Sequence, residues 1–81
     1  MKLLYFAQLV DVLQRSGEDV ALPAGVRNVD QLLGWLAGRG EPWTSHMAAD
    51  RIQVTVNKQF AEPTTEVDDD DEVAFFPVRG A

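Results

Sequence analysis

Hydrophobic residues that alternate with polar ones mark the strands of this 81-residue chain. The clearest case is Ile52–Val56, whose alternation is typical of a strand with one buried face. The first segment, Lys2–Ala7, is apolar on both faces, so we expect both faces to be covered. Another segment, Val20–Leu22, stops before Pro23, which cannot donate to a sheet, and we therefore expect it near an edge. The predicted strands are Lys2–Ala7, Val20–Leu22, Ile52–Val56, Gln59–Ala61 and Glu72–Pro77.

Hydrophobic residues that recur at the helical period of about 3.6 residues predict one main helix. Asn28 can cap its first turn, and Gln31, three residues on, can reach back to the backbone of the cap. Gly38 ends the helix, and its apolar stripe needs a sheet to lie on. The stripe consists of Val29, Leu32, Leu33 and Leu36.

Two shorter segments also have helical spacing. Leu9–Leu13 predicts a short helix that Ser16 ends. Pro42 suits the first position of a further helical turn, which places Trp43 and Met47 on one face.

The order strand, helix, strand, helix and then three strands indicates a single α+β domain over residues 1–81, with a flexible tail over 78–81. One main helix packed on a mixed sheet of about five strands suits the β-grasp arrangement. A small ferredoxin-like split βαβ topology competes with it, because the hydrophobic pattern does not settle the strand order.

The formal net charge of −6 is concentrated at one end of the chain. From Met1 to Lys58, six acidic residues balance six basic ones, whereas seven acids and only Arg79 follow Lys58. This distribution disfavours nucleic-acid binding, which needs a positive surface, and favours a basic partner protein. No apolar run approaches the roughly 20 residues of a membrane-spanning helix, so we expect a soluble cytoplasmic protein.

Neither the composition nor the histidine indicates a reactive centre. The chain has no cysteine, which excludes disulfides, thiolate nucleophiles and cysteine-based metal sites. Asp50 could pair with His46, but no third group completes a metal site or a relay, so we interpret His46 as a surface or loop residue. The run Asp68–Glu72 lacks the alternating acids and the glycine of a calcium-binding EF-hand loop, and we interpret it as a solvated turn. We expect no metal and no cofactor.

The last strand carries two adjacent aromatic residues that must point to opposite faces of the sheet. We place Phe75 in the core and Phe76 on the opposite face, together with Phe60 and Phe6. An exposed aromatic group on a small acidic domain indicates a partner site, although both faces could instead be covered within the domain. The residues Val78–Ala81 then leave a slim peptide that can thread a narrow active site, unless they are simply a frayed terminus.

Three segments resemble the MoaD/ThiS family of ubiquitin-like sulfur carriers, and in particular the small subunit of molybdopterin synthase. Asp71–Gly80 reads DEVAFFPVRG and resembles the DEVAFFPPV-x-GG ending of that family. Leu4–Gln8 resembles the first strand of the family, and Val56–Lys58 resembles its Val-Asn turn. The likeness spans the chain in order and length, and its C-terminal part is the specific one.

The resemblance implies that a ubiquitin-activating-like adenylyltransferase uses ATP to adenylate the C-terminal carboxylate, which then becomes a thiocarboxylate. Gly80 and Ala81 would form this reactive end. The tail would enter the large catalytic subunit of a heterotetrameric molybdopterin synthase, where sulfur passes to cyclic pyranopterin monophosphate. Catalytic side chains belong to that subunit, so the present chain would be its non-catalytic partner. The resemblance assigns the partner interface to Phe6, Phe60, Phe76, Pro77, Val78 and Arg79.

Two departures from the family pattern bear on this assignment. The chain ends Gly80-Ala81 where the family ends Gly-Gly, and one of the two prolines before the tail is missing. Because the methyl group of Ala81 crowds the carbon that must be adenylated, three outcomes are open: tolerant partner enzymes, impaired activation, or a nonfunctional paralogue. Two other functions also remain: a sulfur carrier for thiamine thiazole or tRNA thiolation, and a ubiquitin-like binding module with an inert tail.

Overall fold

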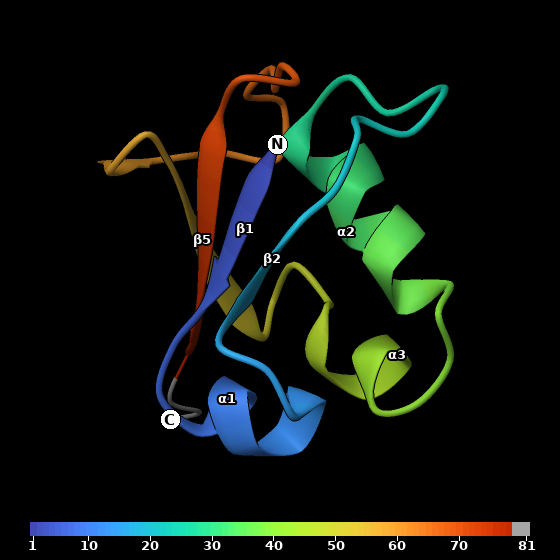
Figure 1. Ribbon diagram of the computed structural model, residues 1–81, viewed down its shortest axis with the longest axis vertical. Coiled ribbons are helices and arrows are strands. Elements are labelled where there is room, and N and C mark those ends of the chain that lie inside the picture. The colour runs from blue at the N-terminus through green and yellow to red at the C-terminus, as the bar shows by residue number, and fades with distance from the viewer. Residues whose placement is uncertain (79–81) are drawn as a thin grey trace.

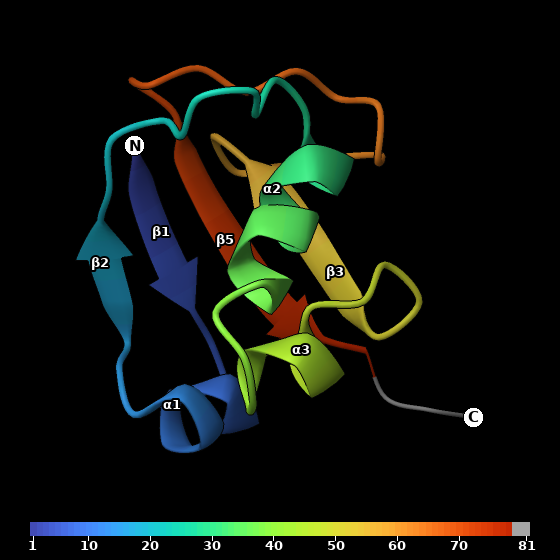
Figure 2. The same ribbon diagram turned by 90° about the vertical axis from the view of Figure 1, so that its right-hand side faces the viewer.

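The computed structural model describes residues 1–78, which form a five-stranded sheet with the helix α2 lying across one of its faces (Figures 1 and 2). The short helices α1 and α3 lie together at one end of the sheet (Figure 2). The strands are β1 (Lys2–Tyr5), β2 (Gly17–Asp19), β3 (Ile52–Val56), β4 (Gln59–Phe60) and β5 (Glu72–Pro77). The helices are α1 (Gln8–Leu13), α2 (Val29–Ala37) and α3 (Trp43–His46).

The strand order is β2-β1-β5-β3-β4, with β1 and β5 parallel at the centre and antiparallel pairs on either side. This arrangement is the predicted β-grasp and not the ferredoxin-like alternative. It brings the first strand and the last strand side by side, with Lys2 opposite Glu72. The sheet therefore depends on a pairing between distant parts of the chain.

The main helix α2 packs on the sheet as its sequence predicts. All four residues of its apolar stripe are buried, and the Asn28 side chain accepts a hydrogen bond from the Gln31 N–H at 2.8 Å. One detail of the cap was wrong: the Gln31 side chain accepts from the N–H of Arg27, at 2.7 Å, and not from the N–H of Asn28. The next two N–H groups of the helix start bond outside the helix: those of Val29 and Asp30 donate to the carbonyls of Thr65 and Pro63, each at 3.0 Å.

The second strand is displaced from its predicted position. Val20–Leu22 was expected, but Gly17–Asp19 pairs with β1 and forms the edge of the sheet. A Cβ added to Gly17 would lie 2.8 Å from the carbonyl oxygen of Leu3, so this close pairing requires glycine. The edge location was predicted correctly, whereas the apolar residues that suggested the strand follow it in the loop.

The core lies between α2 and one face of the sheet. Leu3, Tyr5, Val73 and Phe75 contribute fully buried side chains from the two central strands. The prediction that both faces of the first strand are covered was wrong, because Phe6 is 39% exposed beyond the end of β1. No helix within residues 1–78 has the length and hydropathy needed to cross a membrane.

Candidate functional site: an aromatic face beside the C-terminal residues

The two aromatic residues of β5 lie on opposite faces of the sheet, as predicted. Phe75 is fully buried and stacks on Tyr5 with 5.5 Å between ring centroids. Phe76 lies on the other face and stacks on Phe6, with centroids 4.7 Å apart and ring planes within 7°. Each stack joins β5 to the chain at or just after β1, because these two strands are parallel neighbours.

The strand register adds a third aromatic side chain to this outer face. Thr55 pairs with both Ala74 and Phe60, so all three side chains point to the same side of the sheet. Phe60 is 80% exposed, which is exceptional for a large apolar side chain. We call the set Phe6, Phe60 and Phe76 the aromatic face. The sequence predicted that Phe60 and Phe76 share one face of the sheet with Phe6, and the structure confirms the shared face; their role as a partner interface stays a prediction.

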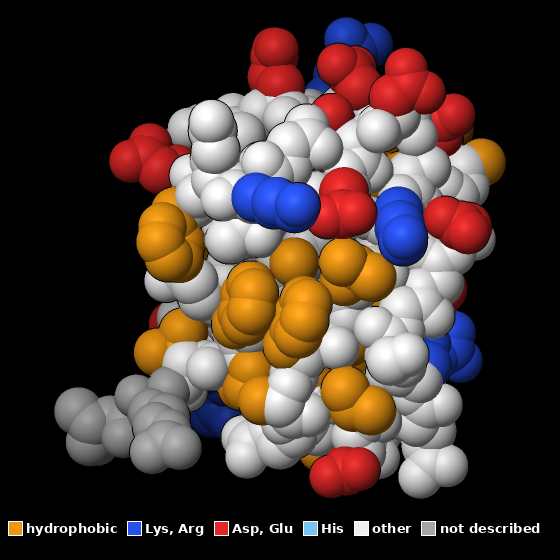
Figure 3. Space-filling view, turned by 60° about the vertical axis from the view of Figure 1, so that its left-hand side comes forward, with side chains coloured by type: hydrophobic (Ala, Val, Ile, Leu, Met, Phe, Trp, Pro, Cys, Tyr) orange, Lys and Arg blue, Asp and Glu red, His pale blue; other side chains and the backbone are white. Residues whose placement is uncertain are grey.

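Charged side chains border the hydrophobic surface on this side of the molecule (Figure 3). Lys2 pairs with Asp19 on β2 and with Glu72 on β5, which sets opposite charges on neighbouring strands. A partner would therefore meet a central apolar area with a polar border, the usual layout of a protein–protein interface.

The acidic run is more ordered than a merely solvated turn. Asp71 accepts the Asp68 N–H at 2.7 Å and the Asn57 side-chain amide at 2.9 Å, which fastens the run to the β3–β4 turn. Asp69 accepts the Leu22 N–H at 2.8 Å. This bond, together with the positive charge of the terminal amino group, lowers the pKa of Asp69. These acids hold the loop at the end of the sheet where β5 begins.

β5 leads away from the acidic turn, so Pro77 and Val78 lie at the opposite end of the sheet, near α1 (Figure 1). The Val78 N–H donates to the Arg51 carbonyl at 3.0 Å, and the Val78 side chain is exposed. The other predicted tail residues, Arg79, Gly80 and Ala81, lie outside the described residues. The flexibility of the tail therefore stays a prediction.

A half-buried ion-pair network, which the sequence did not reveal, ties β2 to the end of α2. Glu18 accepts the Tyr5 hydroxyl at 2.8 Å and two Arg39 hydrogen bonds at 2.8 and 3.1 Å. The Arg39 guanidinium also stacks over Trp35 and Trp43, at 4.7 and 4.5 Å from the ring centroids. Nothing in the local sequence pairs Glu18 with Tyr5 or Arg39, because these residues are 13 and 21 positions away from it.

The charges in this network shift the pKa values of its members. Burial alone would raise the pKa of Glu18, but the hydrogen bonds from Arg39 and Tyr5 outweigh it, so the pKa is lowered. Burial raises the pKa of Tyr5, and the hydrogen bond to Glu18 adds to this effect. Glu18 is therefore a charged anchor for the edge strand, and it lies on the helix side of the sheet, away from the aromatic face.

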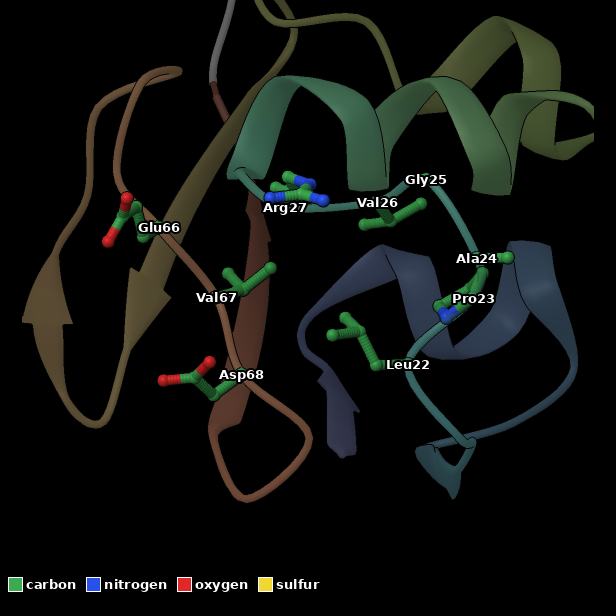
Figure 4. A pocket seen from close by; sticks show the side chains of 9 residues that line it. All are labelled: Leu22, Pro23, Ala24, Gly25, Val26, Arg27, Glu66, Val67 and Asp68. Atoms are coloured by element: carbon green, nitrogen blue, oxygen red, sulfur yellow. The ribbon is translucent and has the colours of Figure 1, made fainter.

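One open hollow of the described surface offers little chemistry. It has a volume of about 460 Å³ and lies between the loop Leu22–Arg27 and the segment Glu66–Asp68. In Figure 4 the carboxylates of Glu66 and Asp68 point away from the loop. Within residues 1–78 no group of three potential metal-binding side chains comes together. His46 is half-buried, and its Nδ1 bonds to the Pro42 carbonyl at 2.9 Å, which favours a structural role.

Comparison with known proteins agrees with this geometry. The profile of the ThiS family matches residues 3–80. A solved structure from Pyrococcus furiosus, provisionally described as molybdopterin converting factor subunit 1, is 27% identical and superposes with a TM-score of 0.76, covering 94% of this chain and 93% of that one. Small archaeal modifier protein 1 (SAMP1) from Haloferax volcanii is 25% identical with a TM-score of 0.74, covering 100% and 97% of the two chains. The profile match over residues 3–80, together with the β-grasp sheet, shows that the chain belongs to the ThiS family of ubiquitin-like sulfur carriers.

Proposed function

We propose that this protein is the small, sulfur-carrying subunit of molybdopterin synthase, and that it works through a thiocarboxylate at Ala81. The observation that carries the proposal is the family match, which extends to Gly80, next to the C-terminal residue. The aromatic face adds to it, because Phe76 lies on the strand that leads to the C-terminus. The likeness to the Pyrococcus furiosus protein supports the choice of molybdopterin synthase within the family.

The chemistry requires a carboxylate and two partner proteins, and no side chain of the carrier. An oxygen of the Ala81 carboxylate attacks the α-phosphate of ATP and releases pyrophosphate, which leaves an acyl-adenylate. A sulfur nucleophile then attacks the acyl carbon and AMP departs, so one oxygen is replaced by sulfur. The large subunit would supply the groups that pass this sulfur to cyclic pyranopterin monophosphate.

The aromatic face would dock the carrier while the tail reaches the reacting centre. Phe60 and Phe76 offer apolar surface to a partner, and the exposed side chain of Val78 follows β5 on the way to the tail. Docking through a face on a rigid sheet leaves the tail free to enter a narrow channel. Arg79, just beyond the described residues, belongs to the same proposed interface by its position in the sequence.

A second use of the same activated end is favoured by the likeness to small archaeal modifier protein 1. An acyl-adenylate can be attacked by an amine as well as by sulfur, which would join the carrier to another protein. A carrier for a different sulfur pathway would share the activation step and differ only in the recipient.

Intact-mass spectrometry tests the proposal. The protein is incubated with its cognate adenylyltransferase, ATP and a sulfur donor, and the C-terminal peptide is then analysed. We expect the mass change of one oxygen replaced by sulfur at Ala81, and the same change in an Ala81→Gly variant. Thiocarboxylation of the glycine variant alone would show that the native end is blocked. Transfer of the sulfur by the large subunit to cyclic pyranopterin monophosphate then separates molybdopterin synthesis from the other pathways.

A further inference from the structure

Half of the outer edge of β3 has hydrogen-bonding groups without a strand beside it. The Val78 N–H donates to the Arg51 carbonyl at 3.0 Å, so the backbone carbonyl of Arg51, just before β3, faces β5. In an antiparallel pair, the N–H and C=O groups of successive residues face alternate sides. Those of Ile52 and Val54 therefore face away from β5, toward the edge of the sheet.

β4 covers only the far half of this edge. Its pairing begins with Gln59 opposite Val56, and the same register would later place Pro63 opposite Ile52. Proline has no N–H to donate, so it cannot continue the ladder. The Pro63 carbonyl instead accepts the N–H of Asp30 at the start of α2, at 3.0 Å. The chain leaves the sheet at this point.

Three backbone groups remain on the open edge. The N–H and C=O of Ile52 and the N–H of Val54 have no backbone partner within residues 1–78, whereas the Val54 carbonyl accepts the Ala61 N–H at 3.0 Å. Both side chains are buried, so packing holds this stretch in its extended form. A fixed, unpaired edge of this kind is a template for another extended chain.

A small apolar groove lies beside the same edge, between β3 and α2. Its volume is about 180 Å³. At about 30 Å³ per water molecule this is the space of about six waters, which suits one aliphatic side chain. No charged residue lines the groove, so it has nothing to offer an ion. Besides the edge residues, its lining is the polar Gln53 together with Val29, Leu33, Ala49, Ala61, Pro63 and Val78.

We propose that β3 receives an extended strand from the large synthase subunit, which hydrogen-bonds to Ile52 and Val54 and inserts one apolar side chain into the groove. The identity of this partner rests on the proposed function. The location of the groove supports it, because Val78 lines the groove and is the last described residue before the tail. A protein that binds the chain at Val78 therefore comes close to this edge. The added strand extends the carrier's sheet into its partner and fixes the direction in which the tail leaves.

Residue-resolved amide hydrogen exchange by NMR tests the pairing directly. In the free carrier the amides of Gln53 and Thr55, which face β5, are protected, whereas those of Ile52 and Val54 exchange at least tenfold faster. In the complex with the large subunit we expect Ile52 and Val54 to become as protected as their neighbours. Concentration-dependent protection of these two amides in the free protein would mean that a second copy of this chain occupies the edge, and the proposal would be overturned.

A steric block provides the second test. Ala49 is exposed at the rim of the groove, and an Ala49→Trp substitution fills the groove without disturbing the core. We expect at least tenfold weaker binding to the large subunit, while the exposed control Thr64→Trp stays within twofold of wild type. Suppose that binding depends on Phe60 but is unchanged by Ala49→Trp, and that the amides of Ile52 and Val54 still exchange rapidly in the complex. The edge proposal is then wrong and the proposed function stands. If the large subunit does not bind at all, both are overturned.

Discussion

Replacing Phe60 with alanine should weaken partner binding without weakening the fold. The side chain is 80% exposed on a two-residue strand, so the folded monomer gains little from it. Burying a phenylalanine side chain against a partner contributes about 1.5–3 kcal/mol, and the exposed fraction scales this to about 1.2–2.4 kcal/mol. At about 1.4 kcal/mol per factor of ten, the expected loss of affinity is about 7- to 50-fold.

Isothermal titration calorimetry with the large subunit measures the affinity, and urea denaturation measures the free energy of unfolding. We expect the latter to change by less than about 0.5 kcal/mol. Trp35→Ala is the matched control, because Trp35 is a large, 37% exposed aromatic residue on α2 and lies away from the aromatic face. Equal losses of affinity for the two variants would refute the assignment of the aromatic face. An unchanged affinity for Phe60→Ala would do the same.

Four further substitutions test the fold, each by urea denaturation. Phe75→Ala removes a fully buried ring and should cost about 3–5 kcal/mol, whereas Phe76→Ala, on the half-buried outer face, should cost less than half as much. Gly17→Ala places a methyl group 2.8 Å from the Leu3 carbonyl and should cost about 1–3 kcal/mol, and an unchanged stability would mean that β2 does not pair this closely. Glu18→Gln should cost about 1.5–3 kcal/mol at neutral pH. The pKa of Glu18 is lower in the folded state than in the unfolded chain. The stability that its charge contributes is therefore fully present above its unfolded pKa and is lost as the pH falls through its folded pKa. The free energies of unfolding of wild type and Glu18→Gln should become equal at that low pH.

The elements that the sequence predicted best are those that short-range contacts determine. The bounds of β3 and β5 match the prediction, and the turn between β3 and β4 falls at Asn57 and Lys58, which take left-handed φ values of 52° and 69°. α2 begins after its predicted cap, Asn28, because the cap and the stripe lie within one stretch of chain. The opposite faces of Phe75 and Phe76 follow from strand alternation alone.

The features that the sequence did not predict depend on distant partners. β2 could not be located from its own residues, because a Gly-Glu-Asp strand has no hydrophobic alternation and forms by pairing with β1. The contacts of Glu18 with Arg39 required the strand order, which places β2 at the edge beside the end of α2. The stack of Phe6 on Phe76 likewise required knowing that β1 and β5 are neighbours.

That central pairing also determines when the carrier can be recognised. Lys2 and Glu72 are 70 residues apart in the sequence, so closing the loop between β1 and β5 is a slow, late step compared with forming α2 or the β3–β4 hairpin. The Phe6–Phe76 stack exists only after this step. If the activating enzyme of the proposed function binds the aromatic face before it acts on the chain end, it selects fully folded copies, and unfolded or half-folded copies would not be charged with sulfur.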